Sequence, residues 1–387
     1  MIQKVQGIQP AVLKWAREAQ GFSIEDIANR LNRTPDEIAE WETGASSPTY
    51  SQLEKLAYTH YKRPLAVFFL PLPPEEPDIK KEFRTLPDFE LDELASDTRY
   101  QVRLGHTRQL SLRELNEGIN QSKRQIFRDL ELSIQDRIET KAQKVRDYLE
   151  LEIEEQTRWR MPDKALKILR FKIEDAGIYV FKNSFEQKEI SGFCLHDDEF
   201  PIIYLNNSTT KTRQIFSLFH ELTHLLLHVN SISKVDFRYI ASLPPRERRI
   251  EQFCNAFAAE VLIPSKDFSR QLTNIKKIDD QLVETLAARY CVSRITVFRK
   301  MLDRKLISQA EYDHRAKLWD SQMEQKTGKG NYYSTQGTYL GEHYLKLVFG
   351  KHYQGKLTLE QVAEYLGVKT GSVAGLEGYA LSRGGSN

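Results

Sequence analysis

Three side chains between residues 216 and 228 have the types and the spacing of a hydrolytic metal site. The stretch reads FSLFHELTHLLLH and contains His220, Glu221 and His224. On a helix, residues four apart lie on one face, so the two imidazoles can bind one zinc ion. Glu221 is rotated by about 100 degrees from His220, which suits a base for the attacking water better than it suits a ligand. This H-E-x-x-H spacing predicts a zinc hydrolase with Glu221 as its catalytic base.

The residues around this motif argue against a helix that contains histidines by chance. Most other positions between 215 and 227 are leucine, isoleucine or phenylalanine. Burying three polar or charged side chains among them without partners is unfavourable. A bound metal ion compensates for that cost, so the apolar surroundings favour a metal site.

Zinc that performs hydrolysis has three protein ligands and one open position, so a third ligand is needed. The stretch RRIEQFCNAFAAEVLIP places Glu251 and Asn255 four residues apart on one helix, beside alanines that allow close packing. We predict that Glu251 is the third ligand and that Asn255 hydrogen-bonds the outer nitrogen of a ligating histidine. Two alternatives stay open: Glu260 replaces Glu251 as the ligand, or Glu251 is a solvated helix charge.

Other polar residues near the motif are weaker candidates. His228 lies one turn beyond His224, where it either stabilises an oxyanion or ends the helix, and we prefer the helix end. His196 and Tyr239 are still weaker candidates for a second electrophile. The run FPIIYLNN (200–207) precedes the motif, and as an edge strand it could pair with an extended peptide substrate. An internal strand is the alternative.

The elements that must position these residues differ along the chain. SIEDIANRL (23–31) and TPDEIAEWETG (34–44) predict two short helices capped by Ser23 and Thr34, with Gly44 ending the second, as in a helix-turn-helix unit. The runs GIYVF, EISGFCL and FPIIYL predict a small, mainly antiparallel sheet just before the motif helix. A loop is expected after that helix, at 229–245. Most of the remaining chain is charged and favours helix.

The composition is that of a globular protein with two or three domains. The 387 residues are 40% hydrophobic and 28% charged, and the formal net charge is +2, so no strong field favours nucleic acid or membrane. Cys194, Cys254 and Cys291 give no disulfide framework and favour a reducing cytoplasm. We expect no signal peptide and no membrane span, because no apolar run approaches about 18 residues.

Residues 145–310 resemble the ImmA/IrrE family of zinc-dependent metallopeptidases. The stretches that carry the resemblance are IEDAGIYVF, EISGFCL, FPIIYLNN, FSLFHELTHLLLH and EQFCNAFAAEVLIP. The resemblance implies a gluzincin-like core with His220, His224 and Glu251 as zinc ligands and Glu221 as the base. It also implies a regulatory protein as substrate, often a phage, mobile-element or stress-response repressor.

Residues 10–70 resemble the XRE (Cro/CI-type) helix-turn-helix family, and WETGASSP (41–48) matches the end of that unit. The second helix departs from a typical DNA reader, because it carries four carboxylates and no Lys or Arg. Arg30 and Arg33, in the turn, are the best remaining DNA contacts. The domain therefore binds DNA, binds a repressor protein or forms a homodimer.

Together these patterns predict an α+β, mostly helical chain. We expect a lambda-repressor-like helix-turn-helix domain at 1–70, a Pro-rich linker at 71–87, a helical connector at 88–144, a zincin-like (gluzincin) metallopeptidase domain at 145–325 and a small C-terminal helical unit at 326–387. The expected function is a cytoplasmic zinc metallopeptidase that cleaves a repressor or antitoxin-like protein encoded nearby. The alternative is a DNA-binding transcriptional regulator or toxin–antitoxin component whose zinc site is structural.

Overall fold

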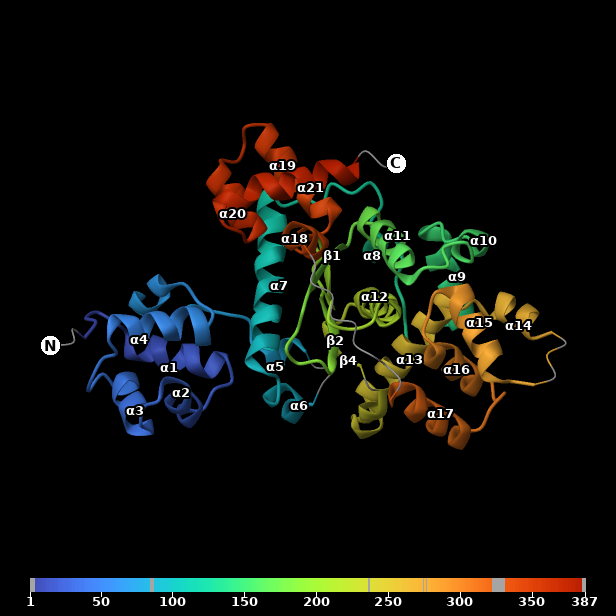
Figure 1. Ribbon diagram of the computed structural model, residues 1–387, viewed down its shortest axis with the longest axis horizontal. Coiled ribbons are helices and arrows are strands. Elements are labelled where there is room, and N and C mark those ends of the chain that lie inside the picture. The colour runs from blue at the N-terminus through green and yellow to red at the C-terminus, as the bar shows by residue number, and fades with distance from the viewer. Residues whose placement is uncertain are drawn as a thin grey trace. The chain divides into compact units, whose positions relative to one another are not determined.

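The structure is a computed structural model that describes residues 4–83, 87–235, 237–273, 275, 277–321 and 331–384, and Figure 1 shows its ribbon. The chain divides into two compact units, Met1–Leu104 and Gly105–Asn387. None of the described helices combines the length and the apolar character needed to cross a bilayer.

In the first unit, short helices pack around one apolar core. Its buried side chains include Val12, Ile27, Ile38, Trp41 and Leu53. The helical segments are α1 (Pro10–Ala19), α2 (Ile24–Leu31), α3 (Pro35–Thr43), α4 (Tyr50–Glu54), a π-helical turn η1 (Lys55–His60), a 3-10 turn η2 (Leu65–Phe69), α5 (Ile79–Glu82), α6 (Asp88–Asp92) and the start of α7 (Ser96–Leu115).

Capping residues fix the helix-turn-helix pair α2–α3. Ser23 Oγ accepts a hydrogen bond from the backbone N–H of Asp26 at 3.0 Å, and Thr34 Oγ1 accepts one from Glu37 at 3.3 Å. Gly44 ends α3 with a φ of 82°, a left-handed conformation that glycine adopts without strain. The caps and the helix end predicted from the sequence are therefore confirmed.

Four strands of the second unit form a mixed sheet in the order β1-β3-β2-β4. They are β1 (Tyr179–Asn183), β2 (Ile190–Leu195), β3 (Ile202–Asn206) and β4 (Ser231–Lys234). β3 pairs in parallel with β1 and antiparallel with β2, and β2 pairs antiparallel with β4. The predicted small, mainly antiparallel sheet is confirmed. The edge-strand interpretation of 200–207 is wrong, because β3 is paired on both sides, and the edge strand β4 lies in the segment 229–245 that was expected to be a loop.

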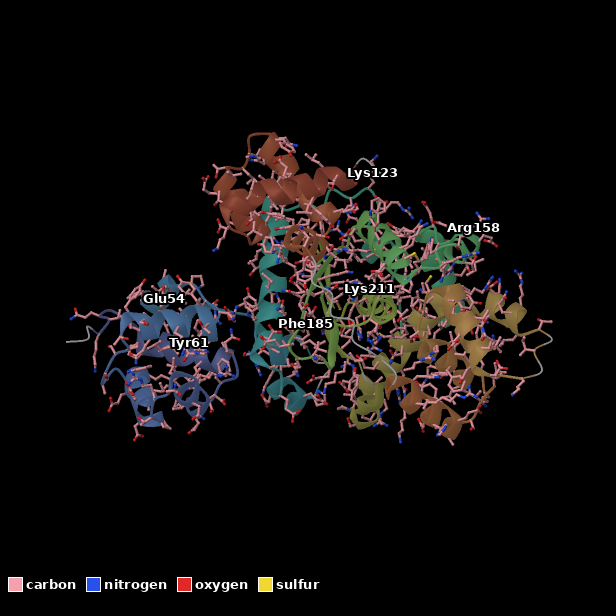
Figure 2. The ribbon with its side chains drawn as sticks, viewed as in Figure 1. Glu54, Tyr61, Lys123, Arg158, Phe185 and Lys211 are labelled. Carbon is pink, nitrogen blue, oxygen red and sulfur yellow. The ribbon has the colours of Figure 1, made fainter. Side chains whose placement is uncertain are left out.

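Helices cover both faces of this sheet. α12 (Lys211–Leu226) packs on one face, as Figure 1 shows. On the other face lies the part of α7 that begins at Gly105, where an added Cβ would sit 2.9 Å from the ring of Phe193. The rings of Phe193 and Tyr204 stack there with centroids 4.9 Å apart, and Phe185, labelled in Figure 2, packs beside both. The glycine therefore allows the helix to approach an aromatic layer closely.

α12 is the central helix of the second unit. Thr210 Oγ1 caps its start by accepting a hydrogen bond from the backbone N–H of Arg213 at 3.3 Å, and the chain leaves its end at His228 with a φ of 56°. α12 packs against α11 (Pro162–Asp175) and α13 (Pro245–Leu262). The two helices that carry the predicted metal ligands therefore contact each other in the core.

Further helices surround this centre. α13 packs against α9 (Ile138–Tyr148), and α15 (Asp280–Tyr290) packs against α16 (Arg294–Asp303). The others in this part of the chain are α8 (Ile126–Asp129), α10 (Ile153–Gln156), the 3-10 turn η3 (Phe237–Ser242), α14 (Ser265–Leu272) and α17 (Gln309–Ser321).

A buried ionic cluster joins the C-terminal helices to α11. Arg170 Nε lies 3.0 Å from Glu174 Oε1, Arg170 Nη1 donates to the carbonyl of Thr338 at 2.5 Å, and His343 Nδ1 lies 3.2 Å from Glu174 Oε2. Because Arg170 and Glu174 are buried, removing one of them leaves the other uncompensated. The helices held in this way are α18 (Tyr332–Leu340) and α19 (Glu342–Tyr353). The remaining elements, α20 (Leu359–Leu366), a 3-10 turn η4 (Thr370–Ser372) and α21 (Val373–Gly384), pack against these two helices or against one another.

We expect Glu174→Gln to lower the free energy of unfolding by about 3 kcal/mol, because Arg170 stays buried without its carboxylate. Burial raises the pKa of Glu174, but Arg170 and His343 outweigh burial, and the net pKa lies below its usual 4.5. The stabilisation is therefore complete above the unfolded-state pKa and is lost as the pH falls through the lowered pKa.

Urea unfolding of the wild type and the variant at several pH values measures this effect. The difference between them should shrink in acid, and Asp175→Asn, an exposed change on the same helix, should leave stability nearly unchanged. A difference that persists undiminished at about pH 2 would contradict the assignment.

Candidate metal centre

Three donor side chains from two helices converge in the core of the second unit. His220 and His224 belong to α12, and Glu251 belongs to α13. The two Nε2 atoms are 3.1 Å apart, and the Glu251 carboxylate oxygens lie 3.3 Å from His220 Nε2 and 3.2 Å from His224 Nε2. Among the described residues, this is the one group of at least three His, Cys, Asp or Glu side chains whose donor atoms could hold a metal ion.

The spacing of these donors fits zinc. Nitrogen and oxygen ligands lie about 2.0–2.1 Å from zinc in a tetrahedron, so neighbouring donor atoms are separated by about 3.3 Å. The two Nε2 atoms, 3.1 Å apart, agree with that value, and each also lies 3.2–3.3 Å from one of the two Glu251 carboxylate oxygens. Two histidines and one glutamate also form the ligand set of many hydrolytic zinc centres. The residues present therefore fit a zinc ion with one position left for chemistry.

Burial couples the charges of this cluster. His220 is 3% exposed, and His224 and Glu251 are fully buried. Burial lowers the pKa of His224, but Cys254 and Glu251 outweigh it, and the net pKa lies well above the usual 6.5. Burial raises the pKa of Glu251, but the two histidines outweigh it, and the net pKa lies below the usual 4.5. The cluster therefore contains a carboxylate that must be neutralised by a proton on His224 or by a metal ion.

A residue of the sheet holds the predicted base, Glu221, in place. Its Oε2 accepts a hydrogen bond from Ser231 Oγ of β4 at 2.5 Å, and Ser231 Oγ lies 3.4 Å from Cys194 Sγ of β2. Glu221 is fully buried, and its Oε1 has no hydrogen-bond partner within the described part of the chain. One oxygen is therefore fixed, while the other is available to hold a water molecule or a proton.

Tyr239, a weak candidate from the sequence, lies in the site. Its Oη donates a hydrogen bond to Glu251 Oε2 at 3.1 Å. Burial, together with Glu251, raises the pKa of Tyr239 well above 10, so the phenol stays a neutral donor. The other two weak candidates contact each other instead: His196 Nε2 lies 2.9 Å from His228 Nδ1.

Glu260, the alternative third ligand, is engaged elsewhere. It forms a buried ion pair with Lys300 of α16 and accepts hydrogen bonds from the backbone N–H and the hydroxyl of Ser265, at 2.8 and 2.7 Å. The geometry therefore favours Glu251, and Glu260 instead ties α13 to α14 and α16.

Asn255 does not bond to either histidine in this structure. Its Oδ1 and the Nδ1 atoms of His220 and His224 have no hydrogen-bond partner among the described residues. The thiol of the preceding residue, Cys254, interacts with His224 instead and, together with Glu251, raises the pKa of that histidine. The hydrogen bond predicted for Asn255 is therefore not formed in this structure.

In the first unit, Arg30 and Arg33 lie at the end of α2 and just after it, and both are exposed. Arg30 stacks over the ring of Phe22 at 4.6 Å, and Arg33 Nη1 lies 3.7 Å from Glu37 Oε1. The exposed face of α3 carries acidic residues, as its sequence indicated. Arg33 is thus partly neutralised by the helix that would read the bases.

Two lysines that the sequence analysis missed lie near Arg30. Lys55 Nζ donates to the carbonyl of Arg30 at 3.4 Å. Burial lowers the pKa of His60, and the charges of Arg30, Lys55 and Lys62 lower it further. Arg30, Lys55 and Lys62 therefore form a basic cluster around His60, built from residues up to 32 positions apart in the sequence.

Comparison with known protein families finds a match for two segments of the chain. A family model described as the IrrE N-terminal-like domain matches residues 173–301, which include all the predicted metal-site residues. A family model described as a helix-turn-helix domain matches residues 11–60. No curated protein matches the chain significantly. The predicted fusion of an XRE-like helix-turn-helix domain with an ImmA/IrrE-type domain is confirmed, which supports a DNA-binding regulator joined to a metallopeptidase-like domain.

We expect the purified chain to bind one zinc ion, and Glu251→Gln to weaken that binding at least about 100-fold, because a charged ligand is removed. Glu260→Gln should keep the zinc and lower the free energy of unfolding by about 3 kcal/mol, since Lys300 is left buried without its partner. Metal analysis measures the zinc content of both variants, and chelator competition measures their zinc affinity. If Glu260→Gln lost the zinc and Glu251→Gln kept it, Glu260 would be the third ligand.

Proposed function

We propose that this chain, an XRE-like helix-turn-helix domain joined to an IrrE-like metallopeptidase domain, is a cytoplasmic zinc metalloendopeptidase that cleaves a regulatory protein. One observation carries the proposal: a second carboxylate, Glu221, is fixed through one oxygen beside the His–His–Glu cluster and keeps its other oxygen available. A zinc ion with a purely structural role needs four closed ligands and no such base.

The chain's own residues have distinct roles in peptide hydrolysis. His220, His224 and Glu251 would hold a zinc ion, which supplies Lewis-acid polarisation of the scissile carbonyl. Glu221 Oε1 takes the proton of the attacking water and passes it to the leaving amine, while Ser231 keeps Oε2 in place. Tyr239, as a neutral phenol, would turn its O–H from Glu251 Oε2 to the oxygen on which negative charge develops.

The edge strand β4 is the substrate-binding strand in this proposal. The outer side of an edge strand offers backbone N–H and C=O groups to an extended peptide. Ser231 and Ile232 are fully buried and Ser233 is 3% exposed, so a peptide would pair with β4 only after the residues that cover this edge move. β4 also carries Ser231, so a peptide added along it would lie close to Glu221. The substrate is a repressor or antitoxin-like protein encoded nearby, and the N-terminal domain brings the protease to DNA or to that partner.

We expect Glu221→Gln to slow cleavage of the neighbouring-gene repressor by at least about 1,000-fold, because the amide cannot accept a proton. The variant should still bind zinc with full stoichiometry, since Glu221 is not a ligand. Ser231→Ala is the matched control. It should keep zinc, and its cleavage rate should fall only about 10- to 100-fold, because the base remains but is no longer held in place. Full cleavage by Glu221→Gln would rule out the proposed base.

A second function, a DNA-binding regulator with a structural metal site, is favoured by the basic cluster of the first unit. Phosphate neutralisation supplies most DNA affinity, and Arg30, Lys55 and Lys62 provide the charge for it. The acidic surface of α3 provides little base-specific contact. Weak, sequence-tolerant DNA binding is the expected result.

We expect the Arg30→Ala, Lys55→Ala double variant to weaken DNA binding by a similar factor on all duplexes and to lower the slope of log K against log salt by about two. Lys14→Ala removes an exposed charge outside the cluster and is the control. Binding isotherms at several salt concentrations test this. Loss of biological activity in the double variant but not in Glu221→Gln would favour the regulator over the protease.

A further inference from the structure

A groove in the second unit, formed by other residues than the metal centre, has the size of a small-ligand site. Its volume is about 430 Å³, within the usual range for such pockets. The C-terminal end of α9, the outer face of α11 and the start of α19 form its walls. Phe171 and Ile168 of α11 supply an apolar surface, and Phe171 is 37% exposed although it is aromatic.

Cations dominate the polar lining of this groove. Arg124, Lys164, Lys167 and Lys172 face three carboxylates there. Two of those carboxylates are already paired: Glu150 lies 2.9 Å from Arg124 Nη1, and Glu342 lies 3.2 Å from Lys167 Nζ.

Two lysines of the groove remain available for an anion. Lys172 donates to the backbone carbonyl of Glu150 at 3.0 Å, and neither Lys164 nor Lys172 forms an ion pair with a described residue. They lie eight residues, or about two turns, apart on α11, with Ile168 one turn from each and Phe171 next to Lys172. A ligand that satisfies this lining needs a compact anion and a flat apolar group.

We propose that this groove binds a nucleotide, with its phosphate on Lys164 and Lys172 and its base on Phe171. Lysine is a common phosphate ligand, and an aromatic face stacks on a nucleobase with little preference among bases. An aliphatic carboxylate lacks the flat group, and inorganic phosphate leaves uncovered the exposed part of the Phe171 ring, which otherwise packs against His343 with centroids 5.1 Å apart.

The groove is also placed to influence the metal centre, and this part of the inference rests on the proposed peptidase function. α11 packs against α12, which carries His220 and His224. α9 packs against α13, which carries Glu251, and Arg146 of α9 donates to the carbonyl of Val261 in α13 at 2.7 Å. A ligand wedged between α9 and α11 therefore acts on the two helices whose spacing sets the zinc ligands.

Calorimetric titration of the full zinc-loaded chain with the four common nucleoside monophosphates tests the site. At least one should bind saturably with a Kd below about 1 mM, and its nucleoside and inorganic phosphate alone should each bind at least about tenfold more weakly. The double variant Lys164→Glu, Lys172→Glu should abolish nucleotide binding. Phe171→Ala should weaken the binding of the nucleotide without changing the binding of inorganic phosphate. Lys266→Glu, an exposed change on α14, should have no effect. Absence of saturable binding, or unchanged binding by the double lysine variant, overturns the proposal.

The Glu221→Gln chain separates this inference from the proposed function. It should bind the nucleotide as the wild type does, whether or not the wild type cleaves a repressor. Bound nucleotide should change the zinc affinity measured by chelator competition at least about threefold, and the rate of repressor cleavage with it. Binding with no change in zinc affinity would overturn the regulatory part, and binding by a chain that cleaves nothing would count against the peptidase alone.

Discussion

The second unit depends on a constraint between α12 and α13: two imidazoles and a carboxylate must meet inside an apolar core. His220, His224 and Glu251 are 0–3% exposed, and their donor atoms lie 3.1–3.3 Å apart. Polar groups at such depth are tolerated only when they neutralise one another or bind an ion. The crossing of the two helices, the alanines in α13 and the capped start of α12 all serve to bring these atoms together.

The sheet holds the reactive group, while the helices hold the metal ligands. Glu221 lies on the same helix as the two histidines, but its orientation depends on Ser231 in β4. β4 in turn pairs with β2, whose Cys194 contacts Ser231. The Glu260–Lys300 pair has a structural role instead, because it fixes α13 to a neighbouring helix, α16.

Local patterns revealed much of this arrangement from the sequence. Helical periodicity places His220 and His224 on one face, and the capping residues Ser23 and Thr34 mark their helices, since each depends on residues within one turn. Ser231 could not be predicted as the partner of Glu221, because β4 is a four-residue SISK segment whose role comes from pairing with β2. The internal place of β3 and the cluster around His60 also depend on contacts between distant parts of the chain. Asn255 shows the limit of spacing: it lies one turn from Glu251, yet its Oδ1 forms no hydrogen bond within the described part of the chain.

Complete enclosure of the three metal-binding side chains has a kinetic consequence. An ion held between α12 and α13 would leave, and a peptide would reach it, only when the protein opens locally, for example when Tyr239 moves away from Glu251. Its residence time is then set by the frequency of that opening rather than by the surrounding concentration of free ion. Such a protein would keep its metal through a brief shortage and respond only to one that outlasts the interval between openings.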